Sequence, residues 1–325
     1  MKRRDFVKNT ALSALGVALV SPLETFGAIP ETHFESNDLS PSASIKNDYP
    51  LNFMAIGDWG RNGEYKQVDV AKQMGIWALN NPNNFTISVG DNFYPNGIIS
   101  EQDPHFHYSF ENVYTAHSLQ GDWFVILGNH DHHGDPDAQI RYSKVSRRWN
   151  MPARYYSKTI DLGKDKGKAL LVMIDTDPFL FDEKKAYVTK QMEWLNRTLV
   201  TGADVKWKIV IGHHPYYTVG PRINNHDTLT MRKNLTSIFE KHKVDVYLSG
   251  HDHSLQHLKP DGYTHQFISG AGSELTPVTE GVSYSRFQAS EHGFMYFSVD
   301  EKRIGVKAIN DEGKVLYETT LNKPA

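Results

Sequence analysis

The chain has 325 residues, of which 39% are apolar and 22% are charged, so it can bury the core of one large domain or two small ones. Its formal net charge of −3 argues against a protein that binds nucleic acid through a basic surface. The sequence contains no cysteine, which excludes disulfide bonds and thiolate metal ligands. Any metal ion must be held by oxygen and imidazole groups, which suit iron, manganese or zinc.

The first 28 residues have the pattern of an export signal. Met1 to Lys8 is basic, Thr10 to Val20 is apolar or small, and Phe26-Gly-Ala28 offers small residues for cleavage. The pair Arg3-Arg4, followed by Phe6, looks like a twin-arginine signal, which would carry a folded protein across a bacterial inner membrane. An ordinary secretory signal or a membrane anchor is the alternative, although this apolar run is too short to cross roughly 30 Å of hydrocarbon.

Cleavage after residue 28 would leave a mature chain that is periplasmic or secreted. The removed segment carries four basic and two acidic residues, so the formal net charge changes from −3 to −5. For the mature chain we expect no nucleic-acid partner and no membrane span, with the twin-arginine (Tat) export machinery as an expected partner. The sequence leaves the cleavage site and the oligomeric state open.

Residues 29–49 are rich in Pro, Ser, Asn and Asp and lack apolar periodicity, which is typical of a flexible linker. The folded domain is therefore expected from residue 50 to residue 325. Short apolar runs alternate there with segments of helical pattern, as in an α/β fold. The expected helices cover Gln67–Leu79, Pro104–Tyr114, Ala138–Trp149, Lys185–Leu199 and Leu229–Lys241.

Beyond Gly262 the pattern changes to strands joined by short turns. Turn residues stand at Asp300-Glu-Lys302 and at Asp311-Glu-Gly313. The C-terminal part is therefore predicted to be mainly antiparallel β. The expected strands cover Thr264–Ser269, Gly293–Val299, Arg303–Ile309 and Val315–Thr320.

Five apolar runs each stop at a glycine beside a carboxylate, amide or imidazole side chain. Short β-branched and aromatic runs predict buried strands, and glycine after a strand allows the backbone to turn sharply. Because sites in open α/β sheets lie beyond the carboxyl ends of strands, we expect these ends to converge on one edge. The five runs are Phe53-Met-Ala-Ile-Gly-Asp58, Thr86-Ile-Ser-Val-Gly-Asp91, Val125-Ile-Leu-Gly-Asn-His130, Ile209-Val-Ile-Gly-His213 and Val246-Tyr-Leu-Ser-Gly-His-Asp-His253.

These side chains suit two metal ions bridged by a carboxylate with one oxygen for each ion. Asp91, between Gly90 and Asn92, is the best candidate for the bridge. Two ions roughly 3.5 to 4 Å apart clamp the attacking and leaving oxygens of a phosphoryl displacement and activate water. His251 and His253 are spaced so that each can turn to a different ion. Each motif alone is more often a turn or an ordinary loop, but the ordered set predicts hydrolysis of a phosphate ester.

The order of the motifs resembles that of the calcineurin-like metallophosphoesterase superfamily and, more narrowly, that of small purple acid phosphatases of the tartrate-resistant type. The resemblance covers the chain from about residue 51 to the C-terminus. It implies an α/β (α+β) fold, a metallophosphoesterase-type αββα sandwich of two central sheets flanked by helices. The motifs are Gly57-Asp-Trp-Gly60, Gly90-Asp-Asn-Phe-Tyr94, Gly128-Asn-His-Asp131, Gly212-His-His-Pro215 and Gly250-His-Asp-His253, with support from 138–144, 148–150 and 269–272.

Tyr94 carries the narrower resemblance. Purple acid phosphatases bind Fe(III) through a tyrosinate at this place, which gives their colour, whereas most metallophosphoesterases lack it. Phenol has a pKa of about 10, so only a strongly charged neighbour such as Fe(III) keeps it ionised in acid. A packing tyrosine beside Phe93 is the alternative, but the position three residues after Asp91 favours ligation.

The resemblance implies a role for eight residues in all. His130 would hold the substrate phosphate and donate a proton to the departing alkoxide, opposite an attacking metal-bound hydroxide. An asparagine among anionic ligands would keep the charge of the site low enough to admit a phosphate dianion. The implied ligands are Asp58, Asp91, Tyr94 and His253 for Fe(III), and Asp91, Asn129, His213 and His251 for a divalent ion, which is Fe(II), Zn(II) or Mn(II).

Two features depart from the family pattern. Animal members carry a disulfide near the active site, so their redox or proteolytic control of that loop does not transfer to a chain without cysteine. His214 stands where the family often has tyrosine. Contact with substrate phosphate and a hydrogen bond to a neighbouring protein group are both open for it.

The sequence thus predicts an exported dimetal acid phosphatase acting on small phosphomonoesters. A phosphodiesterase or nucleotide-cleaving enzyme is the alternative, because related folds run both reactions on the same dimetal core. The loops 96–107, 132–137 and 218–227 would decide between them, and Tyr216, Tyr217 and Arg222 are candidates for contact with a leaving group. A periplasmic metal-binding protein without turnover is a third hypothesis, which the loss of His130 or of a ligand would favour; every expected position is filled.

Overall fold

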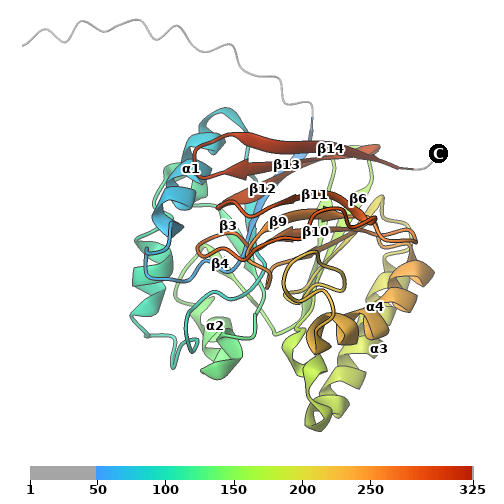
Figure 1. Cartoon of the computed structure of the whole chain (residues 1–325), viewed down its shortest axis with the longest axis horizontal. Helices are drawn as coiled ribbons and strands as arrows, with labels where there is room; N and C mark the ends of the chain where they lie inside the picture. Colours follow the sequence, from blue (N-terminus) through green and yellow to red (C-terminus); the bar gives the residue numbers. More distant parts are fainter. Residues whose placement is uncertain (1–48, 324–325) are drawn as a thin grey trace, which may run out of the picture. The chain divides into compact units, whose positions relative to one another are not determined.

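Two seven-stranded mixed sheets form the centre of the computed structural model, which describes residues 49–323 (Figure 1). The strand order is β14-β13-β12-β1-β2-β3-β4 in the first sheet and β11-β9-β10-β8-β7-β6-β5 in the second. The export signal predicted for residues 1–28 lies outside the described residues, as does all but the last residue of the predicted linker.

Both sheets combine segments that are far apart in the sequence. The first contains β1 (Leu51–Ile56), β2 (Phe85–Ser88), β3 (Asp122–Val125), β4 (Trp149–Asn150), β12 (Gly293–Val299), β13 (Arg303–Asn310) and β14 (Val315–Asn322). The second contains β5 (Tyr156–Asp161), β6 (Lys168–Met173), β7 (Trp207–Ile211), β8 (Val246–Ser249), β9 (Leu255–Leu258), β10 (His265–Ser269) and β11 (Ser285–Ala289). The α-helices are α1 (Gln67–Asn80), α2 (Pro136–Tyr142), α3 (Lys185–Thr201) and α4 (His226–His242).

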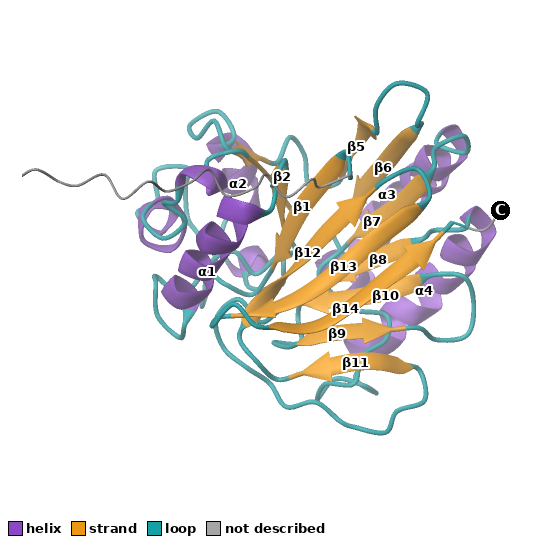
Figure 2. Ribbon diagram, turned by 90° about the horizontal axis from the view of Figure 1, so that it is seen from above, coloured by secondary structure: helices purple, strands orange, loops and turns teal. Residues whose placement is uncertain are grey.

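The strand β1 shows how the layers are held together. Phe53 and Ala55 enter the core between the two sheets, whereas Met54 and Ile56 pack on the opposite face under α1 and α2. Burial on both faces explains why this strand is apolar throughout rather than alternating. Helices α3 and α4 cover the outer face of the second sheet, on the other side from α1 and α2 (Figure 2). The predicted αββα sandwich is therefore confirmed.

The strands that precede the five motifs belong to both sheets. β1, β2 and β3 run parallel in the first sheet, and β7 and β8 run parallel in the second. The backbone N–H of Gly57, after β1, donates to the Ser269 carbonyl at the end of β10, at 2.8 Å. The prediction that the ends converge on one sheet edge is thus wrong in one respect. The carboxyl ends of two stacked sheets meet, and the motifs lie where they join.

Two of the predicted helices are shorter in the structure. The segment 138–149 is helical only within α2, because the chain turns after Tyr142 and buries the guanidinium of Arg148. That group donates to Glu111 at 2.9 Å and to the carbonyl oxygen of Tyr114 at 2.6 Å. The segment 104–114 forms a π-helical turn, Phe106–Glu111, whose two phenylalanines pack against Trp149.

The C-terminal strands follow the prediction closely. β12, β13 and β14 form an antiparallel meander whose turns lie near the expected residues 300–302 and 311–313, and β12 pairs antiparallel with β1. The strands β4, β5, β6, β9 and β11 were not predicted; β5, for example, is exposed or half-buried along its length. None of the helices in residues 49–323 has the length and apolar character that crossing a membrane requires.

A pair of histidines links β9 and β10: His257 on β9 is buried, and His265 on β10 is half-buried. His257 Nε2 is 2.9 Å from His265 Nδ1, and His257 Nδ1 is 2.9 Å from the Tyr317 hydroxyl. Burial lowers the pKa of His257 to about 3 and the pKa of His265 to about 4. The same groups have a pKa of about 6.5 in an unfolded chain.

We expect the free energy of unfolding to decrease as the pH falls from about 6.5 towards 4. Both folded pKa values lie below the unfolded value, so the unfolded state binds more protons in this window, and acid favours it. Each histidine contributes at most about 1.4 kcal/mol per pH unit. His257→Gln keeps a donor and an acceptor but does not titrate, so its denaturant unfolding between pH 7 and 4 should depend less on pH. If the stability of His257→Gln depended on pH as strongly as that of the parent, the histidine pair would not be the cause.

Candidate metal centre

Three of the predicted ligands leave their strands in a left-handed backbone conformation. Asp58, Asp91 and His251 have φ of 57°, 52° and 70°. This region is unfavourable for residues other than glycine and is enriched at functional sites, where the surrounding fold maintains it. The neighbouring glycines give the room for it: a Cβ on Gly128 would lie 2.2 Å from Asp91 Oδ1, and one on Gly250 would lie 2.4 Å from Asp58 Oδ2.

The Tyr94 hydroxyl is the centre of the first group of predicted ligands. It lies 2.8 Å from Asp91 Oδ2, 3.3 Å from Asp58 Oδ1 and 3.2 Å from His253 Nε2. His253 Nε2 is in turn 3.5 Å from Asp58 Oδ1. The four residues assigned to Fe(III) by the resemblance therefore present their polar atoms to one another.

The second group gathers around His213. Its Nε2 lies 3.2 Å from Asn129 Oδ1 and 3.5 Å from Asp91 Oδ2, and its ring centroid is 5.1 Å from that of His251. Asp91 Oδ2 thus faces both groups, while Oδ1 accepts from the backbone N–H of His130 at 2.9 Å. This differs from the expected bridge with one oxygen for each ion, because a single oxygen stands between the groups.

The protein's own charges oppose ionisation of the phenol. Burial, together with the charges of Asp91 and Asp58, raises the pKa of Tyr94 well above its ordinary value. Burial also lowers the pKa of His253 to about 4. For His213, burial opposes protonation, but Asp91 and Asp58 outweigh it and raise the pKa to about 10. A strong positive charge is therefore required to hold Tyr94 as a phenolate.

The arrangement of acceptors around His213 fits a bound cation. His213 Nδ1 donates to the Val89 carbonyl at 2.8 Å, so Nε2 of the neutral ring is an acceptor that faces the acceptor oxygens of Asn129 and Asp91. Such groups need a proton or a metal ion between them. Asp58, Asp91 and His213 also have ligand atoms within 4.8 Å of one another. Carboxylate, amide, phenol and imidazole donors of this kind suit iron, zinc or manganese.

His130 lies beside this centre without joining either group. Its Nδ1 is 2.6 Å from the Pro95 carbonyl oxygen, and its ring centroid is 4.3 Å from that of Tyr94. Since a carbonyl oxygen can only accept, Nδ1 carries a proton and Nε2 is left for a substrate. Nε2 carries a proton as well only when the ring is an imidazolium. The geometry is compatible with the predicted role as proton donor.

The sequence interpretation gave no role to Asp131, which fastens two motif loops together. Its buried carboxylate accepts from the backbone N–H groups of Asn92, at 3.1 Å, and Gly128, at 2.8 Å. Gln139 donates to it at 2.8 Å. Burial, aided by Asp91, raises the pKa of Asp131 to about 6. Asp131, the last residue of the GNHD motif, is therefore a candidate for a structural role. The one sequence feature that could have drawn attention to it is its position two residues after Asn129.

Arg61 was also missed. Its guanidinium lies 3.6 Å from the ring centroid of Tyr94 and forms an ion pair with Glu274. A cation over the face of a tyrosine ring is attracted by the π electrons. Arg61 follows the GDWG motif directly, but Glu274 lies more than two hundred residues away, so no local pattern indicates the pair.

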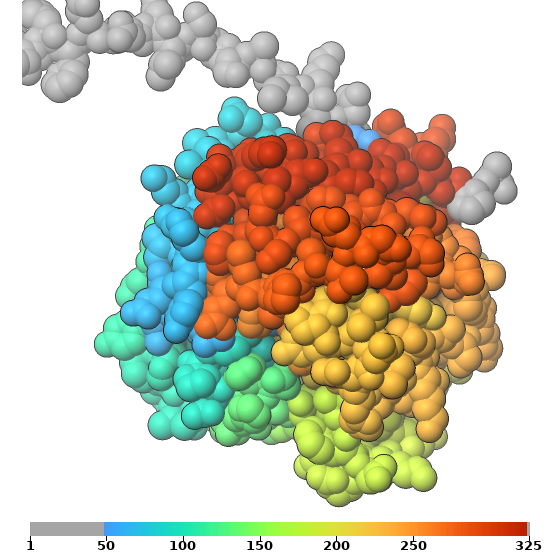
Figure 3. Space-filling model, in the orientation of Figure 1, coloured from blue at the N-terminus to red at the C-terminus, as the bar shows by residue number. Residues whose placement is uncertain are grey.

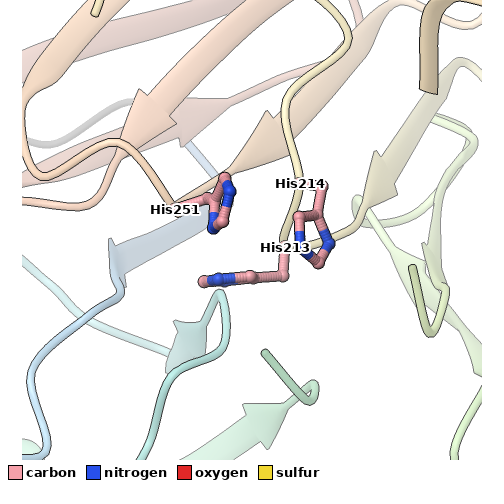
Figure 4. A group of neighbouring side chains, drawn as sticks. All are labelled: His213, His214 and His251. Atoms are coloured by element: carbon pink, nitrogen blue, oxygen red, sulfur yellow. The ribbon is translucent and has the colours of Figure 1, made fainter. Parts of the chain in front are cut away.

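His214 is buried behind the second group (Figure 4). Its Nδ1 is 2.8 Å from the Thr176 hydroxyl, its Nε2 has no hydrogen-bond partner among the described residues, and its ring centroid is 4.3 Å from that of His251. His213, His214 and His251 also have ligand atoms within 4.8 Å of one another. Of the two contacts considered for His214 from the sequence, the structure shows the hydrogen bond to a neighbouring protein group, Thr176.

The comparisons with known proteins agree with this geometry. Residues 51–255 match the family described as calcineurin-like phosphoesterase. The chain is 33% identical over 302 residues to purple acid phosphatase 17 of Arabidopsis thaliana, with 86% of each chain covered. It is 34% identical over 304 residues to tartrate-resistant acid phosphatase type 5 of Oryctolagus cuniculus, with 85% of this chain and 92% of the relative covered.

Solved structures share the fold. GAP50 of Plasmodium, described as the anchor in the inner membrane complex, superposes with a TM-score of 0.76 at 24% identity over 85% of this chain and 89% of its own. A purple acid phosphatase from yellow lupin superposes with a TM-score of 0.64 at 16% identity, over 84% of this chain and 53% of its own. At these identities the likeness shows the fold alone.

The chain therefore belongs to the calcineurin-like phosphoesterase family. Its curated relatives within that family are purple acid phosphatases, including tartrate-resistant type 5 enzymes. The resemblance inferred from the motifs is thus confirmed, and the protein is an acid phosphatase, a phosphoric monoester hydrolase. Its buried His and Asp groups fit a dimetal site of this family, and the identity of each ion stays a prediction.

We expect Tyr94→Phe to abolish visible absorption of the iron-loaded protein while leaving most of the bound metal in place. The substitution removes one oxygen and keeps the ring, and the other residues of the first group keep their donors. Absorption spectra recorded beside metal analysis would test this. A Tyr94→Phe protein that is still purple would refute the assignment of Tyr94 as an iron ligand.

Proposed function

We propose that this protein is an exported purple acid phosphatase that hydrolyses small phosphomonoesters with Fe(III) and a divalent ion, Fe(II), Zn(II) or Mn(II). The observation that carries the proposal is the Tyr94 hydroxyl in direct contact with Asp58, Asp91 and His253. A phenol in this setting supports a trivalent ion, because burial and two carboxylates otherwise keep it protonated.

In the proposed reaction, the chain's own residues place the phosphate and move one proton. When bound, the two ions would neutralise phosphate oxygens and lower the pKa of a water molecule to supply the nucleophile. Asn129 contributes a neutral oxygen, so that the site does not repel a phosphate dianion. His130, oriented by Pro95, would enter the reaction as an imidazolium, donate its Nε2 proton to the leaving oxygen and remain as the neutral ring protonated at Nδ1.

Export is part of the proposal and is supported only by the sequence of residues 1–28. The basic start, the short apolar run and the small residues near position 28 favour a periplasmic or secreted enzyme. The Arg3-Arg4 pair supports the twin-arginine route. Cell fractionation of the full chain, compared with Arg3→Lys/Arg4→Lys, would test it: cytoplasmic protein in both cases would contradict export.

The fold alone does not separate an enzyme from a binding protein, since a protein described as an anchor shares it. The filled site is what favours turnover here: seven donor residues and His130 all lie together. Hydrolysis of 4-nitrophenyl phosphate and of bis(4-nitrophenyl) phosphate, measured from pH 4 to 9, tests the proposal. Preference for the monoester with an acidic optimum would support it, preference for the diester would move the function to phosphodiester cleavage, and no turnover would favour binding alone.

A further inference from the structure

Figure 4 shows three clustered imidazoles, those of His213, His214 and His251. Each of them has one ring nitrogen in a hydrogen bond to another protein group. His213 is tied through Nδ1 to the Val89 carbonyl, at 2.8 Å. His214 is tied through Nδ1 to the Thr176 hydroxyl, at 2.8 Å. His251 is tied through Nε2, 2.7 Å from Asp227 Oδ2. In every case the partner determines which nitrogen is left for another ligand.

The partner of His251 fixes its tautomer. An ionised carboxylate can only accept a hydrogen bond, so Nε2 of the neutral ring carries the proton and Nδ1 carries the lone pair. A metal ion binds the nitrogen with the lone pair. His251 must therefore use Nδ1, whereas His213, held by a carbonyl oxygen at Nδ1, must use Nε2.

Asp227 is itself held firmly. It lies in the first turn of α4, and its Oδ1 accepts from the backbone N–H of Thr228 at 3.0 Å. Arg222, in the loop that precedes α4, donates to Asp252 Oδ1 at 2.7 Å and to the His251 carbonyl at 3.1 Å. The Nε of Arg222 lies 3.8 Å from Asp227 Oδ2. The start of α4 and the loop before it are thereby attached to the turn that carries His251.

The far side of this loop is supported by the segment around residues 276–284. The Val219 carbonyl accepts from the backbone N–H of Thr279 at 2.7 Å, and the Thr218 carbonyl accepts from the Tyr284 hydroxyl at 2.9 Å. In Figure 3 the yellow segment near residue 220 accordingly lies against the orange segment that follows residue 270. The loop that leads into α4 is therefore held at residues 218 and 219 as well as at Arg222.

We propose that Asp227 is a positioning residue that selects Nδ1 of His251 as the ligand atom and thereby retains the divalent ion. The inference rests on the dimetal centre proposed above. Outer carboxylates that orient a ligating histidine typically change metal affinity by about 10-fold to 100-fold when they are removed. Its effect is confined to one ion, because His251 belongs to the second group and the Tyr94 group does not contact Asp227.

A purely structural role for Asp227 predicts something different. The carboxylate also bonds Thr228 at the start of α4, where a negative charge stabilises the helix by about 0.3 to 1 kcal/mol. Loss of that contact would lower the thermal unfolding temperature without removing one ion selectively. Asp182→Ala is a matched control, because Asp182 is an exposed acid in the turn that leads into α3.

The test uses the mature protein loaded with Fe(III) and Zn(II), comparing parent, Asp227→Ala, Asp227→Asn and Asp182→Ala. Metal content is measured after dialysis, Zn(II) affinity by competition with a chromogenic chelator, and the Tyr94–iron absorption and thermal unfolding in parallel. We expect Asp227→Ala to bind Zn(II) about 10-fold to 100-fold more weakly while its visible absorption persists. Asp227→Asn, which keeps a neutral acceptor of the same shape, should lose less, and Asp182→Ala should match the parent.

Each outcome separates the two proposals. If the parent binds two ions and both Asp227 variants keep parental Zn(II) affinity, the positioning role is wrong and the dimetal centre stands. If Asp227→Ala does not fold, Asp227→Asn decides, and parental affinity in that variant overturns the inference. A parent that binds fewer than two ions overturns both proposals.

Discussion

Asp91→Asn should release both metal ions and lower kcat/KM by at least about 10³-fold. One carboxylate oxygen, Oδ2, lies 2.8 Å from the Tyr94 hydroxyl and 3.5 Å from His213 Nε2, so the same atom serves both groups. An amide of the same size removes the negative charge that two cations would share. The loss of several kcal/mol of transition-state stabilisation by the metals corresponds to this change in rate. Metal analysis and steady-state kinetics on the purified variant provide the measurement.

The matched control is Asp58→Asn, which makes the same chemical change at a site of equal burial. Asp58 Oδ1 lies 3.3 Å from the Tyr94 hydroxyl and 3.5 Å from His253 Nε2, but its nearest approach to His213 Nε2 is 3.9 Å. We therefore expect Asp58→Asn to weaken the iron of the first group and to spare the divalent ion. If Asp91→Asn retained both ions, the carboxylate would not be a bridge.

Local sequence patterns explain why the seven candidate ligands could be chosen from the sequence. Five of the candidates directly follow a glycine that ends a buried apolar run. The other two are His253, three positions after Gly250, and Tyr94, three positions after Asp91. Burial makes such strands recognisable, and a sharp turn after a strand leaves a residue like Asp58 in a left-handed conformation. The αββα layering was accessible only through the resemblance, because periodicity alone could not assign β1 and β7 to different sheets.

The supporting residues depend on contacts between distant segments. Asp227 contacts His251, which is 24 residues away in the sequence, and Arg61 contacts Glu274, which is 213 residues away. In the sequence analysis Asp227 is the last residue of the loop 218–227, ahead of the helix expected from Leu229, and Arg61 directly follows the GDWG motif, so no local pattern indicates either role. The same reason explains the shortened helix at residues 138–149: the burial of Arg148 against carbonyl oxygens outweighs the helical propensity of the segment.

The hydrogen bonds of the site support the proposal that His130 is the proton donor. Two other imidazoles have one ring nitrogen each bonded to the protein, His213 to the Val89 carbonyl and His251 to Asp227, and their second nitrogen is assigned to a metal ion by the proposal above. His130 has its Nδ1 bonded to Pro95 and is only half-buried, so its Nε2 can reach a leaving group from solvent. Donation from a positioned histidine contributes about 10²-fold to 10⁴-fold to a rate.

His130→Ala should therefore lower kcat by about 10² to 10⁴ for an alkyl phosphate, whose leaving oxygen needs a proton. The loss should be smaller for 4-nitrophenyl phosphate, because a leaving group of low pKa departs as an anion. Metal content and visible absorption should stay at parental values, since His130 joins neither ligand group. His133→Ala is the matched control: it is exposed, its ring centroid lies 5.4 Å from that of His130, and its activity should remain near the parental level.

The dependence on the leaving group distinguishes donation from positioning. If His130 only held the phosphate, its removal would affect every substrate alike. It would lower kcat by the same factor for alkyl and aryl esters and would raise KM. If His130 is a proton donor, the loss of rate on its removal should increase with the basicity of the departing oxygen. Equal losses would therefore assign His130 to substrate binding, and an unchanged kcat with both substrates would remove it from the reaction.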